Sequence, residues 1–253
     1  MKIETRNKVK ELIKRVILLK IENYNAETEY RPFFQAIFTK EQVLTHTIIH
    51  SFYTTFGISI YEQLAKVLAE GAGYEAYTQY DLLGEIDNRT EAIISKIDME
   101  LRSNKRRPDM ELEFEEIKNS IQKGKLLQDP DKRVDIFIKK KDGTEAYFDI
   151  TSPKPNIKEF VALKKKLLIW IGLRLSADKN TRVIVALGLP YNPYYPKPYK
   201  RWTTRNMYDS CQLMVGEDFW NFVAGEEIYD EFIEIFKEIG EELREEIKEI
   251  AKK

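Results

Sequence analysis

The sequence predicts a mixed α/β fold of the α+β type, in which a helical first half leads into a small sheet. Through the first 125 residues, apolar side chains recur at the spacing of three and four that is typical of amphipathic helices. After Gly124 the pattern changes to short runs rich in Val, Ile, Phe and Tyr, in the order strand, strand, helix, strand. We expect a mainly helical portion over residues 1–125 and a core with C-terminal helices over 126–253, within one continuous domain.

Five helices are expected in the first half of the chain. The first is predicted by the spacing of Val9, Leu12, Ile13, Val16 and Ile17. The third begins near Ile58 and stops at the glycines Gly71 and Gly73, because glycine commonly ends helices. The others cover residues 40–54, 85–101 and 109–124.

The second half is expected to supply the sheet. Strands are predicted over residues 134–140, 145–151 and 181–189, with a helix over 158–175 between the last two. Residues 190–202, PYNPYYPKPYKRW, contain four prolines and are therefore expected to be irregular, since proline donates no backbone hydrogen bond. Helix returns from Glu217 onward.

Composition narrows the functional classes. The 41 basic and 42 acidic residues nearly cancel, so any attraction to nucleic acid must be local. Cys211 is the only cysteine, which excludes an intramolecular disulfide and a multi-cysteine zinc site and fits a reducing cytoplasm. The N-terminal segment is interrupted by Lys and Glu, unlike a signal peptide, and no run approaches the roughly 20 apolar residues of a membrane span. We expect a cytoplasmic protein.

Two aspartates lie within the first two predicted strands. Asp135 and Asp149 interrupt otherwise apolar runs, where an unpaired charge is costly. A three-residue turn at 141–143, with Gly143 left-handed, would place the two aspartates directly opposite each other on one face, with Cβ atoms roughly 5 Å apart. A two-residue turn would place them on opposite faces.

Two carboxylates that close repel unless a proton or a cation neutralises them. Oxygen ligands favour Mg²⁺ completed by water and a substrate phosphate, and the metal would polarise a phosphoryl oxygen. The alternative is that one of the two aspartates sits at a strand end in solvent.

The same stretch resembles a known family. An Asp entering one strand, followed on the next by Asp or Glu, any residue and Lys, is the signature of the PD-(D/E)xK nucleases. More narrowly, RVDIFIKK, YFDITSPKPN, KKKLLIW and PYNPYYPKPYKRW resemble type II restriction endonucleases of the TdeIII kind, over about residues 45 to 222. The resemblance implies a mixed-sheet nuclease core and Mg²⁺-dependent, sequence-specific hydrolysis of double-stranded DNA that leaves 5′-phosphate ends.

The resemblance also implies partners. Cutting both strands of a symmetric site needs two active centres, so a homodimer is expected. The family further suggests a short GC-rich palindrome such as GGNCC. A cognate DNA methyltransferase would act on the same site without needing to bind this chain.

Carried over by position, the resemblance makes Asp135 and Asp149 the metal-ligating acids. The lysine expected two residues beyond the second acid is replaced by Thr151. Three alternatives follow: Lys154 substitutes for it, Thr151 serves with an altered water network, or the chain is impaired or trapped by an engineered substitution. Glu62, on the third predicted helix, either completes the metal shell as in similar nucleases or is an ordinary exposed glutamate.

Candidate DNA-binding residues lie in two segments. Lys164 and Lys165 open the helix that follows the acidic site, although charge runs are usually solvated faces. The Pro/Tyr loop and its continuation offer donors suited to phosphates and base edges: Asn192, Lys197, Lys200, Arg201, Arg205 and Asn206.

Two other functional classes remain open. A DNA-binding protein that has lost catalysis would explain Thr151. A structure-specific repair nuclease would cleave branched DNA without sequence preference, although the Pro/Tyr loop argues mildly against it.

Overall fold

The computed structural model describes residues 1–24, 32–55, 60–127 and 130–250. Its five-stranded sheet has the order β1-β2-β3-β4-β5, antiparallel from β1 to β3 and parallel from β3 to β5. The strands are β1 Glu75–Asp81, β2 Arg133–Lys139, β3 Glu145–Ile150, β4 Val183–Leu189 and β5 Leu213–Val215. The predicted mixed α/β fold is confirmed.

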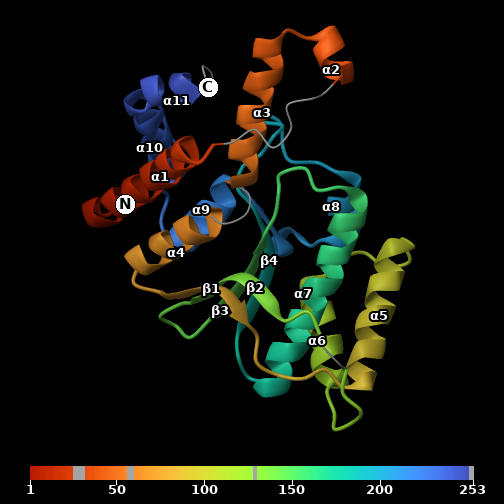
Figure 1. The fold of residues 1–253 in the computed structure, drawn as a ribbon. Helices are drawn as coiled ribbons and strands as arrows, with labels where there is room; N and C mark the ends of the chain where they lie inside the picture. The colour runs from red at the N-terminus through yellow and green to blue at the C-terminus, as the bar shows by residue number, and fades with distance from the viewer. Residues whose placement is uncertain (25–31, 56–59, 128–129, 251–253) are drawn as a thin grey trace.

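Helices surround this sheet (Figure 1). A short 3₁₀ helix, Ser210–Gln212, precedes β5. The α-helices are α1 Ile3–Glu22, α2 Pro32–Ile37, α3 Lys40–Thr55, α4 Tyr61–Gly71, α5 Asn88–Arg102, α6 Met110–Ser120, α7 Ile157–Ala177, α8 Trp202–Met207, α9 Glu217–Ala224, α10 Tyr229–Glu242 and α11 Arg244–Ile250. Within the described ranges, every helix is too short or too polar to span a lipid bilayer.

Two strands were missing from the sequence prediction. β1 lies in the half expected to be helical, and it pairs antiparallel with β2 at the sheet edge. β5 is only three residues long and pairs with β4. Neither gives a clear signal, because β1 is exposed or half-exposed at most positions and β5 is too short for a pattern. The helix predicted over 109–124 ends at Ser120, and the start predicted near Ile58 lies outside the described residues.

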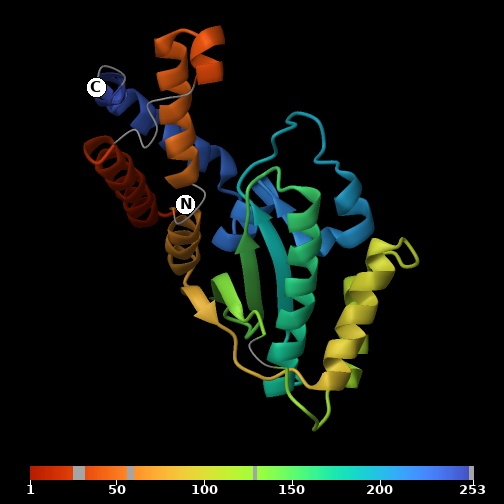
Figure 2. The same ribbon diagram turned by 45° about the vertical axis from the view of Figure 1, so that its right-hand side comes forward.

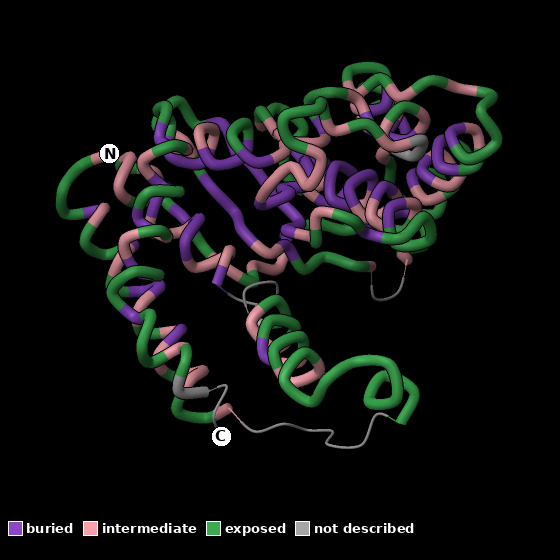
Figure 3. Tube along the Cα trace, turned by 90° about the horizontal axis from the view of Figure 1, so that it is seen from above, coloured by how far each residue is buried: buried purple, intermediate pink, exposed green. Residues whose placement is uncertain are grey.

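Two apolar layers hold the sheet between them, and the views in Figures 1 and 2 agree on this arrangement. α1, α4, α9 and α10 pack on one face, against Ile136, Ile138 and Phe148. α5, α6, α7 and α8 pack on the other, against Phe137, Tyr147 and Leu187. Figure 3 shows this buried centre in purple. Both layers draw residues from either side of position 125; the domain division there stays a prediction.

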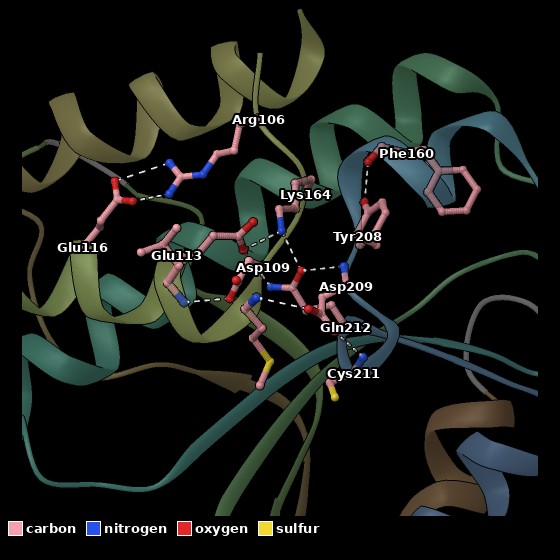
Figure 4. A network of polar contacts seen from close by, with 12 residues as sticks. Arg106, Asp109, Glu113, Glu116, Phe160, Lys164, Tyr208, Asp209, Cys211 and Gln212 are labelled. Carbon is pink, nitrogen blue, oxygen red and sulfur yellow. Dashed lines mark hydrogen bonds and ion pairs between the residues drawn. The ribbon is translucent and has the colours of Figure 1, made fainter. Parts of the chain in front are cut away.

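A buried polar network fastens the second layer (Figure 4). Lys164 on α7 is fully buried, and its Nζ lies 2.6 Å from Glu113 Oε2 on α6 and 2.6 Å from Gln212 Oε1. Gln212 Nε2 also donates to Glu113 Oε2 at 3.1 Å. The second oxygen of Glu113, Oε1, is buried and accepts no hydrogen bond among the described residues. The network ties α6, α7 and the segment before β5 into one unit.

Removing one member of this network leaves a charge buried without its partner, which typically costs about 3–5 kcal/mol. We therefore expect Lys164→Met to lower the free energy of unfolding by about that amount in urea titrations. The double variant Lys164→Met with Glu113→Leu removes both charges and is expected to recover most of the loss. A double variant no more stable than Lys164→Met would show that the ion pair is not the origin of the effect.

Candidate active site at the β2–β3 hairpin

The β2–β3 turn has three residues, 141–143. This is the alternative that the sequence analysis required for the two aspartates to lie opposite each other. Lys140 N donates to Thr144 O at 2.8 Å, Gly143 N donates to Lys140 O at 3.0 Å, and Gly143 has φ +83°. The register pairs Ile136 with Phe148. Extended by one residue, it sets Asp135 opposite Asp149, at the end of the paired segment of β2 and β3.

Asp135 is half-buried between the strands. Its Oδ2 accepts a hydrogen bond from Ile150 N at 2.7 Å. The pKa of Asp135 is raised from 3.8 to about 7, mainly by burial and next by the charge of Asp149, while the Ile150 N–H lowers it. Asp149 is 7% exposed. Both carboxylates are therefore held close together and largely out of water.

Glu62 approaches this pair from α4. Burial raises the pKa of Glu62, and the charge of Asp149 raises it as well, against a hydrogen bond from Gln79. Gln79 Nε2 donates to Glu62 Oε2 at 2.9 Å and to Asp135 Oδ1 at 3.3 Å. The three acids predicted from the sequence thus lie in one electrostatically coupled group, and Glu62 is not an isolated surface glutamate.

Gln79 is a site residue that the sequence did not reveal. It has φ +50°, an uncommon conformation for a residue with a side chain, and the β1–β2 pairing passes from Thr78 to Tyr80 without it. This local irregularity lets the Gln79 amide bridge Glu62 and Asp135. A single glutamine in a half-exposed strand carries no pattern that marks such a role.

Lys166, the third lysine in the run 164–166, is the second residue whose contact with the carboxylates the sequence did not reveal. Asn156 caps α7 by accepting from Glu159 N at 2.9 Å, which starts the helix directly after the hairpin and its short connection. Lys166 then points at the site, with Nζ 2.7 Å from Asp149 Oδ2. Burial lowers the pKa of Lys166, but Asp149, Asp131 and Asp135 together raise it, and the net shift is upward. Lys166 lies four residues before the buried Trp170 and so on the same helix face, a spacing that could have indicated that it points inward.

Thr151 and Lys154 lie differently from what a lysine substitute requires. Thr151 Oγ1 donates to Glu159 Oε1 at 3.3 Å, and Thr151 N donates to Gly188 O at 3.1 Å. Lys154 is exposed, and its Nζ lies 5.2 Å from the ring centroid of Tyr194 in the Pro/Tyr loop. The cation in contact with the carboxylate pair is Lys166 instead.

The candidate DNA-binding residues divide into three groups. Lys164 is buried against Glu113 and is therefore unavailable to a phosphate, so the expectation that it contacts DNA is corrected. Two residues shape the loop: Asn192 Nδ2 donates to Lys197 O at 2.8 Å, and Arg201 Nη1 donates to Pro155 O at 2.7 Å. The exposed or half-exposed remainder comprises Lys165, Lys197, Lys200, Arg205 and Asn206.

A hollow lies beside this loop. Its volume is about 570 Å³, and its lining includes Asn192, Tyr199, Lys200, Arg205 and Asp218. Two of these residues, Lys200 and Arg205, carry exposed positive charge. The hollow gives the cations a concave surface next to the strand ends.

Among the described residues, no group of three or more His, Cys, Asp or Glu side chains is close enough to form a ready-made metal site. The donor chemistry nevertheless fits a hard cation, because Asp135, Asp149 and Glu62 offer only carboxylate oxygens. Burial is the main cause of the raised pKa of Asp135, and the charge of Asp149 raises this pKa by more than Lys166 lowers it. A divalent cation would supply the missing compensation.

The raised pKa of Asp135 makes stability depend on pH. Because the folded state keeps this proton to about pH 7 while the unfolded chain releases it near 3.8, stability falls as pH rises through that window. In metal-free buffer, Asp135→Asn is expected to be more stable than the parent at pH 8, by at most about 4 kcal/mol, with no such gain at pH 4.

Asp142→Asn is a matched control in the same hairpin. The Thr144 N–H lowers the pKa of Asp142, so this variant is expected to show no gain at pH 8. Urea unfolding at both pH values provides the measurement. If Asp135→Asn and the parent are equally stable at pH 8, the interpretation that the ionised Asp135 carboxylate destabilises the fold is contradicted.

Comparison with known proteins bears on the activity of this site. A family model described as the type II restriction endonuclease HinfI matches residues 1–240. The type II restriction enzyme HgiBI of Herpetosiphon aurantiacus is 24% identical over 257 residues, which cover 92% of each chain. HgiCII of the same organism is 25% identical over 220 residues, covering 84% of this chain and 78% of that enzyme.

A third relative comes from a different organism. The type II restriction enzyme MjaII of Methanocaldococcus jannaschii is 24% identical over 190 residues, covering 70% of this chain and half of that enzyme. The expectation of a type II restriction endonuclease, drawn from the hairpin and the Pro/Tyr loop, is confirmed at the level of the family. The chain belongs to the HinfI family of type II restriction endonucleases.

Proposed function

We propose that this chain is a Mg²⁺-dependent restriction endonuclease with a PD-(D/E)xK-type site, which hydrolyses double-stranded DNA and leaves 5′-phosphate and 3′-hydroxyl ends. The observation that carries the proposal is the opposed pair of Asp135 and Asp149, joined by Glu62. A buried pair of like charges is unfavourable for the fold alone. Its retention on a nuclease-family chain supports a catalytic role.

In this proposal Asp135, Asp149 and Glu62 hold Mg²⁺. The bound ion would supply Lewis-acid polarisation of the scissile phosphate and favour ionisation of the attacking water. Gln79 fixes the direction of Glu62 and Asp135 through its two hydrogen bonds. The Ile150 N–H holds Asp135 in place, so the carboxylates need little rearrangement when DNA binds.

DNA would be held by the exposed cations beside the site. Lys165, Lys197 and Lys200 would neutralise phosphates, and Arg205 and Asn206 would contact base edges in the major groove. Asn192 and Arg201 would act by shaping the loop, which their backbone contacts support. The resemblance to TdeIII-like enzymes favours a short GC-rich palindrome such as GGNCC, which a cognate methyltransferase would protect.

We further propose a homodimer, since two strands of a symmetric site need two active centres. The arm formed by α2 and α3 supports this proposal (Figure 3), because its exposed side chains include Phe33 at 82% and Ile37 at 76%. A hollow of about 360 Å³ lies between Phe34, Phe38 and His46 on the same arm. Apolar surface of this kind is usually covered by another protein.

Digestion of a sequenced plasmid tests the activity. The parent chain with Mg²⁺ is expected to yield discrete fragments whose ends accept ligation at one short sequence. Asp135→Ala is expected to lower the rate by more than roughly 100-fold, because a metal ligand is lost. Asp142→Ala serves as the matched aspartate control and is expected to cut like the parent. A ladder without sequence preference would favour a different class of nuclease.

Sedimentation equilibrium tests the dimer. Charges at two exposed apolar positions, Phe33→Asp with Ile37→Asp, are expected to convert a dimer of the parent chain into a monomer of unchanged fold. The control pair Lys8→Asp with Arg15→Asp alters exposed charge on α1 and is expected to leave the dimer intact. A parent chain that is monomeric at micromolar concentration, alone and with DNA, would contradict the homodimer.

A further inference from the structure

Strand β3 of the hairpin carries no lysine, and position 151 beyond it is a threonine, but helix α7 brings a lysine to Asp149. At position 151, where the strand turns its next side chain to the face of Asp149, the side chain is a threonine bonded to Glu159. From α7, Lys166 brings its Nζ to 2.7 Å from Asp149 Oδ2. The charge of a lysine is therefore present at the site, but it arrives from a helix.

Three consecutive lysines on α7 have three different environments. Lys164 is buried against Glu113, and Lys165 is half-exposed. Successive helical residues point about 100° apart, so only one of the three can face Asp149. The ion pair of Lys164 with Glu113 fixes the rotation of α7 and thereby directs Lys166 toward the sheet.

Lys166 is held rather than free. Its side chain is 19% exposed, its Nζ lies 5.1 Å from the ring centroid of Trp170, and Asp131 is 3.9 Å away. An ammonium group retains further donors after it binds one carboxylate oxygen. Because the group is not fully covered, these donors can reach a phosphate or a water placed at the carboxylates.

We propose that Lys166 is the catalytic lysine of this chain, contributed by α7 in place of a lysine at position 151. This inference rests on the proposed nuclease function. Lys166 orients Asp149 and donates hydrogen bonds to the attacking water and to a non-bridging oxygen of the scissile phosphate, where negative charge grows. It remains protonated throughout.

The reaction balances with water as the only co-reactant. The water oxygen forms a bond to phosphorus and loses a proton to solvent. The bond from phosphorus to the 3′ oxygen breaks, and its electron pair stays on that oxygen, which takes a proton from solvent. The products are a 5′-phosphate and a 3′-hydroxyl.

The test compares Lys166→Met with the double variant Lys166→Met and Thr151→Lys. Single-turnover cleavage with Mg²⁺, DNA affinity with Ca²⁺, Mn²⁺ affinity by calorimetry and thermal unfolding are measured for each. We expect Lys166→Met to lower the cleavage rate by roughly 100-fold or more, with DNA affinity within about threefold and Mn²⁺ affinity not reduced. The double variant, which carries a lysine at position 151, is expected to cleave at least roughly tenfold faster than Lys166→Met.

Lys179→Ala is the control, at a lysine just beyond the C-terminal end of the same helix. Lys179 Nζ donates to Ile121 O at 3.3 Å, near the opposite end of α7, and its removal is expected to leave all four measurements unchanged. If Lys166→Met does not fold, the same measurements on Lys166→Arg decide. A rate reduced by at least roughly tenfold with unchanged Mn²⁺ affinity supports the proposal, and an unchanged rate overturns it.

The remaining outcomes separate the two proposals. A parent chain that cuts while Lys166→Met cuts within about threefold of it overturns the role of Lys166 and leaves the nuclease function standing. Joint loss of Mn²⁺ binding, DNA binding and cleavage would make Lys166 a structural ion-pair partner only, which also overturns its role. A parent chain that cuts no DNA overturns the proposed function itself and the role of Lys166 with it.

Discussion

The opposition of two carboxylates at the β2–β3 hairpin is the constraint on which the rest of the site depends. Their placement follows from a three-residue turn, since one residue fewer would send Asp135 and Asp149 to different faces. Burial first, and then the charge of Asp149, raises the pKa of Asp135 to about 7. Every neighbouring polar group then serves to hold or offset this charge.

That offset comes from elements far apart in the chain. Gln79 on β1 joins Glu62 to Asp135, and Lys166 on α7 contacts Asp149. Helix α7 makes two kinds of contact: Lys164 binds Glu113 in the interior, and Lys166 binds Asp149 at the site. The buried network of Figure 4 thus holds the helix that also carries Lys166. In the proposed function, substrate and metal would complete the neutralisation of these charges, which offsets the cost of burying them.

Some features followed from local chemistry and could be predicted. The strands around Asp135 and Asp149 and the helix α7 were marked by composition and periodicity, and Gly143 marked the turn. Lys164 was wrongly expected at the DNA surface, because a run of lysines gives no indication of which one turns inward. β1 was missed because pairing with β2 at the sheet edge, rather than its own pattern, makes it a strand.

The sequence by itself determined the mixed α/β class, the hairpin and its two aspartates, since these depend on side-chain alternation and turn chemistry within a few residues. The match of the chain to type II restriction endonucleases is likewise a property of the sequence. Only the tertiary structure decided which lysine meets the carboxylates and that Gln79 bridges two of the acids. These contacts join residues 17 to 56 positions apart, and helix rotation and strand irregularity fix them through packing that no local pattern encodes.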